Sequence, residues 1–183
     1  QAMAAGSEFR LKQAAVRRVS APPLHSEEPL NTPEAAIRVM AKELKDYDRE
    51  VVCLVNLQTD LKPINFSIAS MGALDSSVLH PRELMKAMFL SNASRTMMIH
   101  NHPSGSLRPS KEDIEITDRM AQLCQLAGIP LLDHIIIGAG NDREYFSFHE
   151  KGILKAEMPR YAQTMDELQM PLPMVAETRP SVL

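Results

Sequence analysis

Five short segments rich in β-branched and aliphatic residues predict the strands of a β-sheet. In chain order, these predicted strands are residues 50–57, 64–71, 96–100, 131–137 and 145–148. The first and the fourth are largely apolar at successive positions, which is typical of strands that are buried on both faces. Asp60 and Pro63 mark a turn between the first two strands, so this part of the pattern predicts a hairpin.

Three longer segments carry apolar residues at helical spacing and predict helices over residues 31–47, 81–93 and 110–127. The first begins with a residue of capping type and with Pro33 at the first helical position, and the third stops at Gly128. One face of the second helix is expected to be buried and carries Leu84, Met85, Met88 and Phe89.

The resulting order of elements, α-β-β-α-β-α-β-β, predicts a single α/β domain in which helices flank a mixed sheet. This domain is expected to span residues 31–155. Residues 1–30 are expected to be a cloning scar and a flexible arm, because Gly6–Phe9 is what two adjacent cloning sites encode. Residues 156–183 contain several prolines and are expected to form a tail, with one short helix over 161–170.

Composition narrows the class of protein. The 183 residues fit one domain with extensions, at about 150 residues per domain, and 44% hydrophobic residues are ordinary for a globular protein. A net charge of −3 argues against a dedicated nucleic-acid binder. The basic arm Arg10–Arg18 carries few positive charges, which salt screens, so it predicts weak nucleic-acid binding or none. No apolar run approaches the roughly 18 residues that span a bilayer, so no membrane segment is expected.

The two cysteines provide evidence about the compartment. Cys53 and Cys124 both lie in apolar segments and are expected to be reduced thiols in the core. Reduced, unpaired cysteines favour a cytoplasmic location.

Two histidines at the end of the third predicted strand are the first candidates for chemistry. Side chains alternate along a strand, so His100 and His102 point to the same face and can share one metal ion. Pro103 lacks the backbone donor that a continuing strand would need. The pair therefore belongs at the end of the strand, where a site can form.

Ser110 and Asp113 have two interpretations. They resemble a capping box, with Asp113 in place of the usual glutamate or glutamine, and a well-capped helix alone would explain both residues. Alternatively, the carboxylate of Asp113 could meet the two imidazoles across the Pro103–Pro109 loop. Two imidazoles and one carboxylate would leave the fourth position of a zinc ion for water, as catalytic zinc sites do.

The spacing of these residues resembles a known family signature. His100-x-His102, seven residues, Ser110, two residues and Asp113 match the His-x-His-x7-Ser-x2-Asp pattern of the JAMM (MPN+) zinc metalloproteases. Further segments of the sequence resemble the bacterial RadC-type branch of this family. They are residues 80–83, 100–105, 109–110, Thr117, 132–138, 147–148 and Gly152. The resemblance covers residues 31–153, and it implies an αβα sandwich of the JAMM/MPN type, similar to the cytidine-deaminase-like fold.

The resemblance also implies roles for individual residues. His100, His102 and Asp113 would bind one zinc ion per chain, and Ser110 would help to stabilise an oxyanion. Glu50, preceded by Arg49 as in the Arg-Glu pattern of the family, would be general base and acid through a zinc-activated water. A charge at the surface just before a strand would equally explain Glu50.

These features predict a zinc-dependent metallohydrolase that cleaves a peptide or isopeptide bond. Its partner would be a polypeptide or a ubiquitin-like protein, and a homodimer is compatible with the sequence. The alternative is a RadC-like accessory or binding module that is non-catalytic or associated with DNA repair. Two other zinc chemistries are excluded, because neither the His-Glu-x-x-His pattern of zincins nor the Pro-Cys-x-x-Cys pattern of deaminases occurs.

Overall fold

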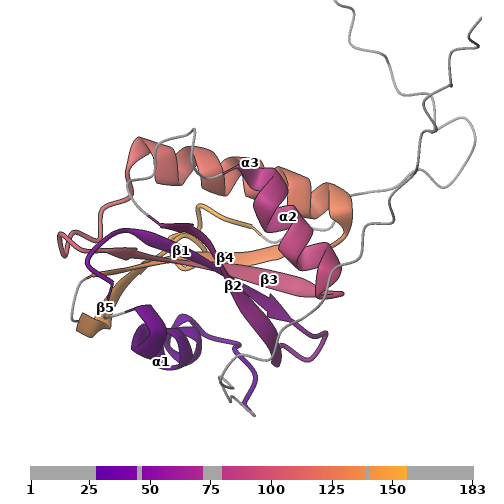
Figure 1. The fold of residues 1–183 in the computed structure, drawn as a ribbon, viewed down its shortest axis with the longest axis horizontal. Coiled ribbons are helices and arrows are strands. Elements are labelled where there is room, and N and C mark those ends of the chain that lie inside the picture. The colour runs from indigo at the N-terminus through magenta and orange to yellow at the C-terminus, as the bar shows by residue number, and fades with distance from the viewer. Residues whose placement is uncertain (1–27, 45–46, 72–79, 139–140, 156–183) are drawn as a thin grey trace, which may run out of the picture.

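The structure of the protein is a computed structural model that describes residues 28–44, 47–71, 80–138 and 141–155. Its elements follow the expected order and confirm an α/β domain with a mixed sheet and flanking helices (Figure 1). In chain order they are α1 (Pro33–Leu44), β1 (Val51–Leu57), β2 (Pro63–Met71), α2 (Pro81–Leu90), β3 (Arg95–His102), α3 (Lys111–Ala127), β4 (Leu131–Gly138) and β5 (Asn141–Ser147).

The sheet has the strand order β2-β1-β3-β4-β5. β1 and β2 form the expected antiparallel hairpin, and β1 also pairs antiparallel with β3. β3 and β4 are parallel, so their connection must cross over one face of the sheet, and α3 makes that crossover. β5 closes the far edge antiparallel to β4. The end of β3 therefore lies in the middle of the sheet, between the start of β1 and the end of β4.

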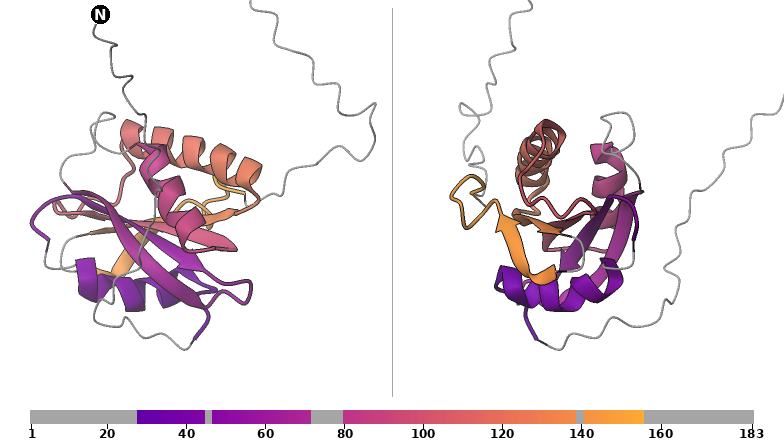
Figure 2. Two further views of the ribbon diagram at one scale, coloured as in Figure 1. Left: turned by 45° about the vertical axis from the view of Figure 1, so that its right-hand side comes forward. Right: turned by 90° about the vertical axis from the view of Figure 1, so that its left-hand side faces the viewer.

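Helices cover both faces of the sheet and enclose a core on each side. α1 packs on one face, and α2 and α3 pack on the other (Figures 1 and 2). On the α1 side the buried strand residues include Val51, Cys53, Val55, Ile99 and Ile137. On the α3 side the buried strand residues include Val52, Leu54, Met98 and Ile136, and Met120 of α3 packs in the same core. Successive residues of β1 thus enter opposite cores, as the continuous apolar run predicted.

Several predicted boundaries and one predicted face were wrong. α1 ends at Leu44 rather than at residue 47, and β5 spans Asn141–Ser147 rather than residues 145–148. α2 ends at Leu90 rather than at residue 93, because the Ser91 hydroxyl donates to the Ala87 carbonyl oxygen and Asn92 adopts a left-handed backbone with φ +51°. Phe89 does not share the buried face of Leu84 and Met88, since it is 57% exposed. β3 continues past residue 100 to His102, because β1 still pairs with it at Asn101 and β4 pairs with it at His102.

Both cysteines lie in the apolar cores. Cys53 and Cys124 are free and buried, as expected, and burial raises the pKa of each thiol to about 12. The proposed scar and most of the arm, and the short helix over 161–170, lie outside the described residues. Among the residues that the structure describes, no helix combines the length and the apolar character needed to cross a bilayer.

A buried asparagine fixes the point where β1 begins. Asn101 is 4% exposed and points to the α1 side of β3. The Val51 amide donates to its Oδ1 at 2.6 Å, and its Nδ2 donates to the Arg49 carbonyl oxygen at 3.1 Å. One side-chain amide therefore holds the backbone on both sides of Glu50.

We predict that Asn101→Ala lowers the free energy of unfolding by about 1–3 kcal/mol, because it leaves the buried Val51 amide without a partner. Urea denaturation measures this loss. The matched control is Gln122→Ala, which removes an exposed amide hydrogen bond to Asp118 and should stay within about 0.5 kcal/mol of the parent. Equal, small effects of the two substitutions would contradict a structural role for Asn101.

Candidate metal centre

The two histidines lie on the same face of β3, as the alternation of strand side chains predicted. The ring centroids of His100 and His102 are 4.5 Å apart, with the planes nearly perpendicular. Both side chains are buried under the loop that leads to α3. Since β1 runs antiparallel to β3 and Val52 pairs with His100, the start of β1 lies beside the end of β3.

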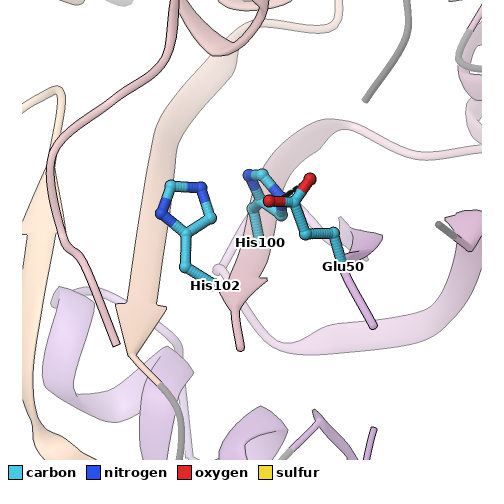
Figure 3. A group of neighbouring side chains, drawn as sticks. All are labelled: Glu50, His100 and His102. Carbon is cyan, nitrogen blue, oxygen red and sulfur yellow. Dashed lines mark ion pairs between the residues drawn. The ribbon is translucent and has the colours of Figure 1, made fainter. Parts of the chain in front are cut away.

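This pairing brings Glu50 to the histidines, although it is 50 residues away from His100 in the chain. Glu50 Oε2 lies 3.9 Å from His100 Nε2, and the carboxylate is drawn against the imidazole in Figure 3. One potential ligand atom from each of Glu50, His100 and His102 lies within 4.8 Å of the other two. The Glu50 side chain is 33% exposed, so this group of ligands is in contact with solvent.

Asp113 approaches the same histidines from the opposite side, on the first turn of α3. It is completely buried, with Oδ1 3.0 Å from His100 Nδ1 and Oδ2 3.5 Å from His102 Nε2. Despite the short distance, the His100–Asp113 contact lacks the geometry of a hydrogen bond. Within the described part of the chain, Asp113 Oδ1 and both ring nitrogens of His100 have no hydrogen-bond partner.

These unpartnered atoms fit a cation. Buried polar atoms are normally hydrogen-bonded, so a group of buried nitrogen and oxygen atoms without such partners needs another explanation. Imidazole nitrogens and a carboxylate oxygen are ligands that zinc and similar divalent ions accept. The residues present therefore suit a metal ion, and the surroundings supply no competing hydrogen-bond partner for His100 among the described residues.

The charges in this group are strongly coupled. Burial by itself would raise the pKa of Asp113, but the interactions of its carboxylate with His100, His102 and the Ser110 amide outweigh it and hold that pKa far below its ordinary value. The carboxylate of Asp113 in turn raises the pKa of His102, against the opposing effect of burial. Asp113 is thus an anion at neutral pH, which is the form that binds a metal.

Ser110 makes the capping box that its spacing suggested. Its backbone amide and its hydroxyl both donate to Asp113 Oδ2, each at 2.7 Å, and Asp113 N donates back to Ser110 Oγ at 3.0 Å. Capping and the approach to the histidines are therefore not exclusive alternatives. The same carboxylate uses Oδ2 for the cap and presents Oδ1 to His100.

A second buried layer supports the centre from the side of β4. Thr117 Oγ1 donates to the Asp113 carbonyl oxygen at 2.5 Å and also contacts His134 Nδ1 at 2.6 Å. The His134 ring stacks between those of His100 and Phe148, with centroid distances of 6.1 and 5.0 Å. Burial lowers the pKa of His134 to about 3, so this imidazole is neutral.

Sequence reasoning identified most of these residues but missed Asn101. It singled out His100, His102, Asp113, Ser110 and Glu50, and the structure brings all five to one end of the sheet. A signal for the missed residue was present, because Asn101 lies between His100 and His102 near the end of a strand, and its side-chain amide needs partners once it is buried.

Comparison with known proteins gives the family. A family model described as the RadC-like JAB domain matches residues 30–153. The chain is also similar to a UPF0758 protein of Desulfitobacterium hafniense, with 40% identity over 125 residues, covering 68% of this chain and 54% of that protein. A UPF0758 protein of Desulforamulus reducens is 38% identical over 138 residues, covering 75% of this chain and 60% of that protein.

The curated relatives are longer than the region they share with this protein, and the chain spans about half of their length. Their printed names give no activity. The match of the family model nevertheless covers well over half of the chain, including every residue of the centre described above. The chain therefore belongs to the RadC-like JAB domain family.

Proposed function

We propose that this domain is a zinc-dependent hydrolase that cleaves a peptide or isopeptide bond. One observation carries the proposal: histidines from β3, a buried aspartate from α3 and a partly exposed glutamate before β1 converge at one end of the sheet. Of these four side chains, Glu50 is the most exposed, so reactants would approach from its side.

The proposed metal ligands are His100, His102 and Asp113, which would hold one zinc ion per chain. All three are at least nine-tenths buried, and two of them carry atoms without a hydrogen-bond partner. Two nitrogen ligands and one oxygen ligand are a known set for catalytic zinc, which leaves a fourth position open. When bound there, zinc supplies Lewis acidity that brings the pKa of a water molecule down to about 7.

Glu50 is the proposed general base and acid. Its carboxylate lies near His100 without being buried, so it can meet both the proposed metal ligands and a substrate from solvent. It would take a proton from the attacking water and return it to the leaving amine. The Asn101 amide fixes the backbone on either side of Glu50 and so limits where the carboxylate can reach.

Ser110 is the proposed donor to the oxyanion that forms on the substrate carbonyl. Its hydroxyl now donates to Asp113 Oδ2, so this role requires the hydroxyl to turn away from the carboxylate. The backbone amide of Ser110 donates to the same oxygen and would keep Asp113 in place while the hydroxyl turns. The cap and the oxyanion role are thus compatible.

For the substrate we propose a polypeptide, with a conjugated ubiquitin-like protein as one form, acted on in the cytoplasm. An amide carbonyl is the electrophile that a Lewis acid, a general base and a hydroxyl donor together suit. The alternative of a DNA-associated accessory module rests on the basic arm Arg10–Arg18, which lies outside the described residues.

We predict that protein purified without added zinc contains about one zinc per chain, because the buried Asp113 carboxylate lies 3.0 Å from His100 Nδ1 and 3.5 Å from His102 Nε2. Elemental analysis measures the stoichiometry. His102→Ala should lose the metal, and His149→Ala, which alters an exposed histidine, should keep it. Full zinc content in His102→Ala would refute the ligand assignment. Chelator-treated protein should remain folded, because two apolar cores form without the metal.

We expect Glu50→Gln to retain zinc and fold but to lose about 100- to 10,000-fold in turnover, because an amide of the same shape cannot accept the proton. Cleavage of a library of peptide and isopeptide-linked substrates, scored on those that the parent cleaves, measures the loss. Glu83→Gln is the matched control, since Glu83 is an exposed glutamate on α2 paired with Lys86. Cleavage by Glu50→Gln at the parental rate would exclude Glu50 as the base.

Replacing Ser110 separates its two roles. Ser110→Ala should lower the free energy of unfolding by about 1 kcal/mol through loss of the cap. It should also lower turnover on the order of 100-fold through loss of the oxyanion donor. Ser110→Thr keeps a hydroxyl and should retain most of both. Urea denaturation measures the loss of the cap, and turnover on the same samples measures the loss of the oxyanion donor. A loss of stability with unchanged turnover would leave only the capping role.

A further inference from the structure

The loop that leaves β3, residues 103–109, folds back over the end of β4. The fold-back begins with a turn in which the Gly105 amide donates to the His102 carbonyl oxygen at 3.0 Å. Gly105 has φ +78°, a left-handed conformation that glycine adopts without strain. The last pair of the β3–β4 ladder, His102 with Gly138, lies directly beneath this turn.

Gly138 is the residue on which the loop rests. A Cβ at position 138 would lie 3.0 Å from the Gly105 carbonyl oxygen and 3.4 Å from its Cα. Both are backbone atoms, which cannot swing aside as a flexible side chain can. The φ of Gly138 is outside the left-handed range, so the requirement for glycine here comes from the close approach of the loop.

The seated loop also contacts the candidate metal centre. Next to Gly105, the Ser106 carbonyl oxygen lies 2.6 Å from His102 Nδ1. A carbonyl oxygen only accepts, so Nδ1 carries the proton in this hydrogen bond. In a neutral imidazole the lone pair is then on Nε2, the nitrogen that faces Asp113 Oδ2 at 3.5 Å.

We propose that Gly138 is a positioning residue of the metal centre: its missing side chain lets residues 103–109 seat so that Ser106 fixes the His102 ring with Nε2 as the binding nitrogen. The inference rests on the proposed zinc site, because it assigns His102 as a ligand. Partners of this kind orient ligand histidines and set the tautomer, and their loss typically weakens metal binding about 10- to 100-fold.

The test compares Gly138→Ala and Gly138→Val with the parent chain in two measurements. Competition with a chromophoric chelator gives the zinc affinity. Long-range ¹H–¹⁵N correlation spectra of the metal-free protein at alkaline pH give the tautomer of His102, independently of metal and of activity. We expect a loss of the Nδ1–H tautomer and a weakening of zinc binding by about 10-fold for alanine, and by more for valine.

The control is Gly152→Ala. Gly152 has φ +69°, and a methyl group added at its Cα would meet nothing within 4 Å, so the substitution strains a turn without displacing a neighbour. It should lower stability but leave the His102 tautomer and the zinc affinity unchanged. This separates a general effect of replacing glycine from an effect on the loop.

The outcomes separate this inference from the proposed function. If Gly138→Ala keeps the parental tautomer and binds zinc within about twofold of the parent, Gly138 is not a positioning residue, even though the zinc site stands. If the parent binds no zinc, the proposed function fails, and a tautomer change in Gly138→Ala would still establish the contact through the loop. Should the valine variant fail to fold, the alanine variant alone decides.

Discussion

The burial of the Asp113 carboxylate against two histidines is the constraint around which this end of the molecule is built. An isolated carboxylate in a protein interior is costly, so it needs hydrogen-bond donors and positive charge. Ser110 satisfies Oδ2 twice through the cap of α3, and His102 faces the same oxygen. Oδ1 faces His100 Nδ1 without a hydrogen bond, and both atoms are of the kind that bind a cation. The helix cap and the candidate metal centre therefore share one carboxylate.

The rest of the fold serves to bring these groups together. The crossover through α3 places its first turn over the end of β3, since parallel strands require such a connection. The antiparallel pairing of β1 with β3 places Glu50 on the other side of His100. Apolar cores on both faces of the sheet hold these strands, so the polar groups at the strand ends are held in place by packing that does not involve them.

How much the sequence revealed differed from element to element. The two-sided apolar run of β1 and the glycine after α3 were sufficient to locate those elements, because each depends on local patterning. The end of α2 was not, because Ser91 and Asn92 stop the helix through hydrogen bonds and backbone conformation rather than through a strong breaking residue. The end of β3 was only partly visible: the apolar run stops at residue 100, whereas Pro103 marks the point after His102 where the strand ends and pairing with β4 carries β3 to that residue.

The sequence by itself determined the order of elements, the shared face of His100 and His102, and the cap that joins Ser110 to Asp113, since each follows from the period of a strand or the first turn of a helix. Only the tertiary structure decided that Glu50 meets His100 and that Asn101 holds the start of β1. It also decided that Gly138 lies under the loop after His102. The reason is physical: these contacts join residues far apart in the chain, and strand order and register, which the whole core sets together, bring them within reach.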